Sequence, residues 1–168
     1  MCGIVGFISS QQQKETVIEA MMERIVHRGP NSAGKYVDDQ IALGFRRLSI
    51  VDLEGGSQPI YNEDRSKVII FNGEIYNYQR LREDLVLLGH VFTTNTDTEV
   101  LLHGYEEWGV DLLQKIRGMY AFAIWDIEKQ ELFGARDHFG IKPFYYAEMN
   151  GTFMFGSEIK SFLPHPDF

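Results

Sequence analysis

Two short segments, VIIF at 68–71 and YAFAIW at 120–125, are apolar on both of their alternating faces. Successive side chains of a β-strand point to opposite faces of its sheet, so strands of this composition must be covered on both sides. A second sheet on one face and helices on the other meet this requirement. The pattern therefore predicts an α+β fold, an αββα sandwich of two antiparallel sheets between helical layers.

Hydrophobic periodicity and turn signals predict the other elements. Strands are expected at 2–9, 40–50 and 67–75, and strand–turn–strand units at 119–137 and 144–158. Helices are expected at 14–30, 77–89, 96–109 and 111–116. Three local signals support these assignments: Asn77 as a helix cap, Thr96 three residues before Glu99 as a capping box, and Asn150-Gly151 as a type I′ hairpin turn.

Composition restricts the class of protein. Sixteen Lys and Arg against 24 Asp and Glu give a formal net charge of −8, which offers no basic footprint for nucleic acid or an anionic membrane. The single cysteine cannot form an internal disulfide, and the N-terminus has neither a basic region nor a long apolar run. We therefore expect one cytoplasmic domain over residues 1–168, with no internal boundary.

The cysteine is the second residue of the chain, in MCGIVGF. Once Met1 is removed, the Cys2 thiol would lie beside its own α-amine, a base with an ordinary pKa of about 7.7–8.0. One residue would then supply both the nucleophile and the proton acceptor, as in enzymes with an N-terminal threonine. Alone the signal is weak, because a free cysteine also packs as a small apolar residue.

Candidate partners for such a nucleophile stand at predicted strand ends. Asn72 and Gly73 offer a side-chain amide and an unobstructed N–H, the two donors that an oxyanion needs, although an isolated Asn-Gly pair is also typical of a tight turn. Asp137 and His138 in RDHFG suggest a metal site, but the five histidines show no ligand spacing and no second cysteine exists. We expect no metal.

Seven strings occur in order along the chain: MCGIVG, HRGP, RRLSIVD, GGSQP, NGEIYNY, TDTEV and RDHFGIKPFYY. Together they resemble the class II glutamine amidotransferase domain of glutamine-hydrolysing asparagine synthetases, over nearly all 168 residues. The resemblance implies an N-terminal-nucleophile hydrolase fold, which is an αββα sandwich and agrees with the strand pattern.

The resemblance also implies roles for eight residues. These are Cys2 as nucleophile, Asn72 and Gly73 as oxyanion donors, Arg47 for the substrate α-carboxylate, Glu74 and Asp97 for its α-ammonium, and backbone groups of Ile50 and Val51 as pocket wall. Ordinary alternatives exist for three of them. Arg47 and its neighbour Arg46 are both typical of ion-paired surface arginines, Glu74 of an exposed strand, and Asp97 of a first helical turn.

The implied reaction converts L-glutamine to glutamate and ammonia through a Cys2 thioester. In the resembled enzymes a C-terminal synthetase domain binds ATP, magnesium and aspartate and receives the ammonia; these 168 residues contain no pyrophosphate-binding loop, and we expect no cofactor in this domain. An apolar face left by that domain would favour association, so a homodimer is among the expected partners. The alternatives are a non-catalytic module of a synthetase, an amidotransferase serving another acceptor, and a peptide-cleaving N-terminal-nucleophile enzyme.

Overall fold

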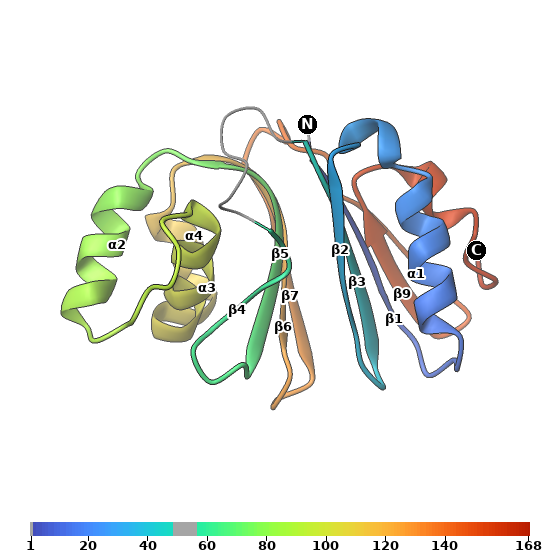
Figure 1. Cartoon of the computed structure of the whole chain (residues 1–168), viewed down its shortest axis with the longest axis horizontal. Helices are drawn as coiled ribbons and strands as arrows, with labels where there is room; N and C mark the ends of the chain where they lie inside the picture. Colours follow the sequence, from blue (N-terminus) through green and yellow to red (C-terminus); the bar gives the residue numbers. More distant parts are fainter. Residues whose placement is uncertain (1, 49–56) are drawn as a thin grey trace.

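Two antiparallel sheets pack face to face between helices in the computed structural model, which describes residues 2–48 and 57–168. Figure 1 shows the layers edge-on, with helices covering the outer face of each sheet. This arrangement confirms the αββα sandwich expected from the strand pattern. Within the described residues, none of the helices has both the length and the apolar composition that a membrane crossing requires.

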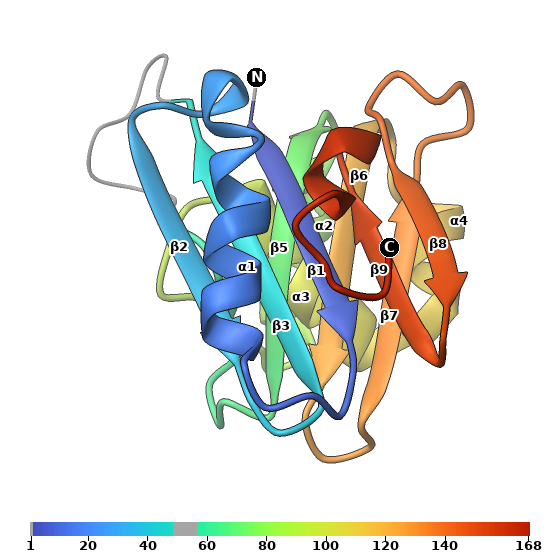
Figure 2. The same ribbon diagram turned by 90° about the vertical axis from the view of Figure 1, so that its right-hand side faces the viewer.

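The first sheet has the strand order β2-β3-β1-β9-β8. Its strands are β1 (Gly3–Ile8), β2 (Ser32–Val37), β3 (Ile41–Arg47), β8 (Tyr145–Met149) and β9 (Thr152–Gly156). Helix α1 (Lys14–Glu23) and the 3₁₀ turn η3 (Ile159–Phe162) cover its outer face, as Figure 2 shows.

The second sheet has the order β4-β5-β6-β7. Its strands are β4 (Ile60–Tyr61), β5 (Lys67–Ile75), β6 (Gly118–Asp126) and β7 (Glu131–Arg136). The helical layer on its outer face consists of α2 (Tyr78–Leu87), α3 (Asp97–Trp108), η2 (Gly109–Asp111) and α4 (Leu112–Lys115).

Strand β6 explains why the chain needs four layers. Ala121, Ala123 and Trp125 pack between the two sheets, whereas Phe122 and Ile124 pack against the helices. All five side chains are at most 1% exposed. Burial of apolar surface contributes about 25 cal/mol per Å², and it is the main term that holds this strand against the other sheet and against the helices.

The local signals are confirmed with two modifications. Thr96 caps α3 by accepting the N–H of Glu99, and Asn150 and Gly151 have φ of 53° and 77°, as a type I′ turn requires. The Glu99 carboxylate does not return to Thr96 but accepts the N–H groups of two preceding threonines. Asn77 occupies the cap position of α2, yet its amide binds the main chain at Lys115 and Arg117.

The helix expected over 14–30 ends earlier, at Glu23, and a separate 3₁₀ turn η1 (Val26–Arg28) follows. The apolar positions continue to Ile25, but the chain must then turn toward the end of β3. A Cβ on Gly29 would lie 2.4 Å from the carbonyl carbon of Arg46, so only glycine permits this approach.

Candidate active site

The start of β1 and the ends of β3 and β5 lie at the same edge of the sandwich, at the top in Figure 1. The core cluster between the sheets includes Ile4 of β1, Phe45 of β3 and Ile70 of β5. Cys2, Arg47 and Asn72 each lie two residues further toward this edge, on β1, β3 and β5 or next to them. Side chains two residues apart on a strand share a face, so all three are directed inward. The stacking of the two sheets thus gathers three of the residues predicted from sequence.

The pleat of β3 separates the two adjacent arginines. Arg46 lies on the outer face, where its guanidinium donates to the Met22 carbonyl oxygen at 3.3 Å and to the Glu23 carboxylate at 2.8 Å. Arg47 lies on the inner face, and extending the β1–β3 register by one residue places it opposite Cys2. The structure therefore distinguishes the two, and Arg47 is the one directed to the candidate site.

Cys2 is held through both its side chain and its main chain. Its sulfur lies 3.5 Å from the Leu48 nitrogen, and its carbonyl oxygen accepts a hydrogen bond from Arg28 Nε at 3.1 Å. Glu158 binds the same guanidinium at 3.1 Å. Burial alone would raise the pKa of Glu158, but hydrogen bonds from His27, Arg28 and a lysine outweigh it and lower the pKa to about 2.

Asn72 is 2% exposed and carries an unpartnered donor. Within residues 2–48 and 57–168, no acceptor forms a hydrogen bond with its Nδ2. A buried donor without an acceptor is unfavourable by about 1–3 kcal/mol, so it is rare unless a ligand completes it. The amide is therefore available to an anionic oxygen at the edge where Cys2 lies.

Gly73 directs its N–H away from β6. Tyr120 is its cross-strand neighbour, but the N–H and C=O of Tyr120 bind Asp137 instead, so the Gly73–Tyr120 pair is not hydrogen-bonded. Both main-chain groups of Phe71, on the same side of β5 as the Gly73 N–H, bind the side chain of Gln58. Glycine is required here also for packing, because a Cβ would lie 2.1 Å from the Met119 oxygen.

Asp97 joins the start of α3 to the end of β5. Its carboxylate accepts the Ile75 N–H at 2.9 Å and so lies beside Glu74, which is exposed. Burial raises the pKa of Asp97, the Ile75 hydrogen bond opposes this rise, and the negative charge of Glu74 adds to it. Two carboxyl groups held close together favour a cation between them.

Two predicted residues, Ile50 and Val51, lie outside the described residues. Two positioning residues were not predicted: Arg28, which holds the Cys2 carbonyl, and Gln58, which holds β5 beside Asn72. Both stand in strings noted in the sequence, HRGP and GGSQP, but they act on main-chain groups that are remote along the chain.

The RDHFG string has a structural explanation. Asp137 is 5% exposed, and its carboxylate accepts four main-chain N–H groups, from Tyr120, Phe139, Ile141 and Lys142, at 2.9–3.2 Å. These bonds occupy the carboxylate with the turn that leads from β7 to β8. The string therefore organises the main chain at this edge.

A family model for the glutamine amidotransferase domain matches residues 1–168. The chain belongs to this family. Among curated proteins, asparagine synthetase [glutamine-hydrolyzing] 1 of Bacillus subtilis is 48% identical over 97% of this chain and 27% of its own length. Asparagine synthetase [glutamine-hydrolyzing] 3 of Arabidopsis thaliana is 39% identical over 96% of this chain and 28% of its own length. The chain thus spans about a quarter of the length of these relatives.

Solved structures show the same fold at lower identity. Glutamine phosphoribosylpyrophosphate amidotransferase from B. subtilis, complexed with ADP and GMP, superposes with a TM-score of 0.81 at 22% identity. The match covers 96% of this chain and 43% of that chain. The sandwich of this amidotransferase domain is therefore shared with an enzyme whose sequence has diverged widely.

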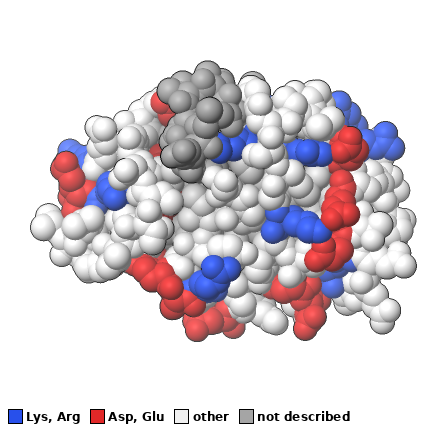
Figure 3. Space-filling model, in the orientation of Figure 1, with Lys and Arg blue, Asp and Glu red and all other residues white. Residues whose placement is uncertain are grey.

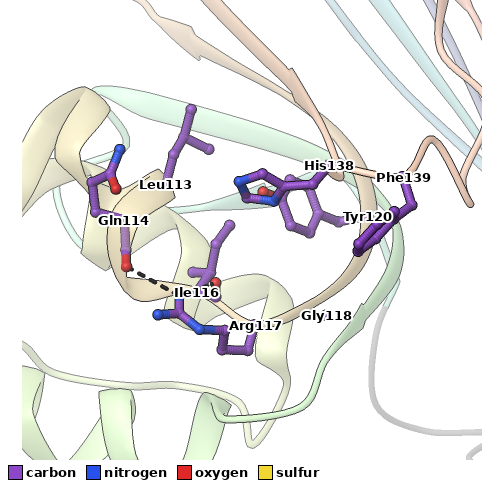
Figure 4. A pocket seen from close by; sticks show the side chains of 8 residues that line it. All are labelled: Leu113, Gln114, Ile116, Arg117, Gly118, Tyr120, His138 and Phe139. Atoms are coloured by element: carbon purple, nitrogen blue, oxygen red, sulfur yellow. Dashed lines mark hydrogen bonds between the residues drawn. The ribbon is translucent and has the colours of Figure 1, made fainter.

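A pocket of about 410 Å³ lies beside the start of β6 in this amidotransferase domain. Figure 4 shows its lining, in which His138 and Tyr120 face Arg117 across the opening and the Arg117 guanidinium donates to the Gln114 carbonyl. None of the predicted site residues that the structure describes lines it. On the face shown in Figure 3, basic side chains lie beside acidic ones.

Proposed function

We propose that this chain is a glutaminase, which hydrolyses the side-chain amide of L-glutamine to glutamate and ammonia through Cys2. The observation that carries the proposal is the buried Nδ2 of Asn72, which has no hydrogen-bond partner within the described residues and lies on the inward face at the edge where Cys2 precedes β1. An amide donor and a nucleophile directed into one space are the two parts that acyl transfer requires.

The steps use groups of this chain and one water. With Met1 removed, the Cys2 α-amine takes the thiol proton and the sulfur attacks the glutamine amide carbon. Asn72 Nδ2 and the Gly73 N–H donate to the oxyanion, the C–N bond breaks, and the ammonium of Cys2 returns a proton to the leaving ammonia. Water then adds to the thioester, glutamate leaves and the thiol reforms.

Charges at the same edge suit the two ends of an amino acid. The Arg47 guanidinium offers a planar pair of donors for the α-carboxylate. Glu74 and Asp97, held together through the Ile75 N–H, offer negative charge for the α-ammonium. The opposite signs orient glutamine so that its side chain extends toward Cys2. Backbone groups of Ile50 and Val51 complete the pocket wall in this proposal.

The ammonia would serve a second activity elsewhere in a longer protein. The relatives are named asparagine synthetases and are about four times as long as this chain. We therefore assign ATP, magnesium and the amidation of aspartate to a C-terminal synthetase domain in the cytoplasm. Exposed apolar side chains before and on β8, among them Phe139, Ile141 and Tyr146, suit contact with that domain or with a second copy in a homodimer.

The test is the intact mass of the purified chain before and after treatment with 6-diazo-5-oxo-L-norleucine, a glutamine mimic that alkylates such cysteines. We expect loss of Met1 and one adduct that is absent from the Cys2→Ser variant. Glutamate release measured on the same sample should be abolished by the adduct. A processed chain that forms no adduct and releases no glutamate would support the non-catalytic module instead.

A further inference from the structure

Four ionisable side chains meet beside the second half of α3. Glu63 comes from the turn after β4, His90 from the segment after α2, and His103 and Glu106 from successive turns of α3. One nitrogen or oxygen atom of each lies within 4.8 Å of the corresponding atoms of the other three. None of the four residues belongs to the candidate active site, and none has a part in the proposed reaction.

Each of the two carboxylates, Glu63 and Glu106, is held through one of its oxygens and directs the other toward the centre of the cluster. Glu63 Oε1 accepts the Val91 N–H at 2.9 Å, and Glu106 Oε1 accepts Asn62 Nδ2 at 2.6 Å. The second oxygens face His103 Nδ1: Glu106 Oε2 forms a hydrogen bond with it at 2.7 Å, and Glu63 Oε2 lies 3.6 Å from it. Two acidic oxygens are therefore oriented toward the same imidazole nitrogen.

Both imidazoles have a second carboxylate behind them. His103 Nε2 lies 3.5 Å from Glu99 Oε1, and His90 Nε2 lies 3.2 Å from Glu107 Oε2. An imidazole with a carboxylate on its outer nitrogen is the usual arrangement of a metal-ligating histidine, because the carboxylate fixes the tautomer and the ring orientation. The inner nitrogens, His103 Nδ1 and His90 Nδ1, face the centre, where a bound cation would replace the proton that His103 Nδ1 shares with Glu106 Oε2.

His103 supplies an independent indication. Its side chain is 1% exposed, and within the described residues its Nε2 has no hydrogen-bond partner by distance and angle. A buried imidazole nitrogen without a hydrogen-bond partner is unfavourable. A small rotation of the ring toward a bound ion would let His103 Nε2 form a hydrogen bond with Glu99 Oε1.

We propose that Glu63, His90, His103 and Glu106 bind one divalent cation of the zinc class. Two imidazole nitrogens and two carboxylate oxygens suit Zn²⁺ and Co²⁺ in tetrahedral coordination. The ligand atoms of such an ion lie roughly 3.3 Å apart, given bonds of about 2.0 Å. The separations are 2.7 Å from His103 Nδ1 to Glu106 Oε2, 3.6 Å from His103 Nδ1 to Glu63 Oε2 and 3.9 Å from His90 Nδ1 to Glu106 Oε2, so ligation would lengthen the first and shorten the other two.

The ion would join three segments that are far apart in the sequence. The turn after β4, the α2–α3 connection and the middle of α3 would be fixed to one another, and α3 carries Asp97 at its first position. We infer a structural role, in which the ion stabilises the helical layer and thereby the position of Asp97.

The experiment titrates Co²⁺ into the chelator-treated chain in a Cys2→Ser background, so that the thiol does not compete. We expect one Co²⁺ per chain, the intense visible absorption of tetrahedral Co²⁺, its displacement by Zn²⁺, and a higher melting temperature with Zn²⁺. No Co²⁺ binding, or only the weak absorption of octahedral Co²⁺, would overturn the proposal.

Variants locate the site. Glu63→Gln and His90→Gln should each weaken Co²⁺ binding tenfold or more, while far-ultraviolet circular dichroism remains that of the parent. His138→Gln removes an exposed histidine from the turn between β7 and β8 and should leave binding unchanged. Equal affinity in all three variants would contradict the assignment of ligands.

Discussion

Asn72 decides the proposed chemistry at the scale of single residues. Its Nδ2 is buried without an acceptor in the described part of the chain, so the native state carries an unfavourable group that a bound oxyanion would satisfy. We expect Asn72→Ala to lower kcat for glutamine hydrolysis roughly a hundredfold or more, because one oxyanion donor contributes about 3 kcal/mol. Glutamate release measures the effect.

The same substitution should not destabilise the fold. Alanine removes the unpartnered amide, so the free energy of unfolding in urea should stay equal or rise. A processed Asn72→Ala chain with parental glutaminase activity would contradict the role of Asn72, and a large loss of stability would contradict the unpartnered state of its amide.

Asp97 should show a similar conflict between stability and binding. Burial raises its pKa, so the folded chain holds its proton to higher pH than the unfolded chain. Stability from this group is present at low pH and is lost as pH rises through the raised pKa. Asp97→Asn keeps an oxygen for the Ile75 N–H and should therefore raise the free energy of unfolding at pH 7.

Binding should change in the opposite direction. Without the Asp97 charge, the KM for glutamine should rise roughly tenfold, because the ammonium loses one of two carboxylates. Asp84→Asn, which neutralises an exposed carboxylate on α2, is the matched control and should change neither quantity. A lower KM in Asp97→Asn would contradict the proposed ammonium site.

Among the elements, the start of β1 depends on a side chain from η1. Arg28 donates to the Cys2 carbonyl at 3.1 Å and is itself bound by Glu158. We expect Arg28→Ala to lower kcat roughly 10- to 100-fold with little change in KM, because a nucleophile displaced by about 1 Å reacts much more slowly. Arg46→Ala, on the outer face of β3, is the control and should retain activity.

Arg28→Lys should restore part of the lost kcat, since an ammonium can also donate to the Cys2 carbonyl. Steady-state kinetics of the three variants measures the division between kcat and KM. If Arg28→Ala raised KM alone, Arg28 would act on substrate binding and not on the position of Cys2.

Elements with strong local patterns were predicted well. The strand expected at 67–75 matches β5 residue for residue, and the capping signal places the first turn of α3 correctly. The half-exposed β2 and the two-residue β4 were not predicted, because neither has a run of alternating apolar residues long enough to detect.

The residues of the candidate site also divide into those that were predicted from sequence and those that were not. Residues that carry chemistry in their own side chains, such as Cys2 and Asn72, were predicted. Arg28 and Gln58 were not, because each binds the main chain of a segment 26 or 13 residues away. The four proposed metal ligands have no local spacing for the same reason, since they come from three segments.

For the whole molecule, buried or partly buried carboxylates tie separate parts of the sandwich together. Asp38 accepts Trp125 Nε1 across the two sheets at 2.8 Å, Asp137 holds the turn between β7 and β8, and Glu158 holds η1. Burial would raise the pKa of each, but hydrogen bonds outweigh it and lower all three values, that of Glu158 to about 2.

Groups with lowered pKa values stabilise the fold above the pKa of the unfolded chain, and this stability is lost as pH falls. The free energy of unfolding should therefore decline steadily below about pH 4.5, because three such groups outweigh the opposite contribution of Asp97. Urea unfolding at pH 7, 5, 4 and 3 measures it. Glu158→Gln should flatten the decline, since its carboxylate is the one held down to about pH 2. An unfolding free energy unchanged from pH 6 to 3 would show that these carboxylates do not hold the layers together.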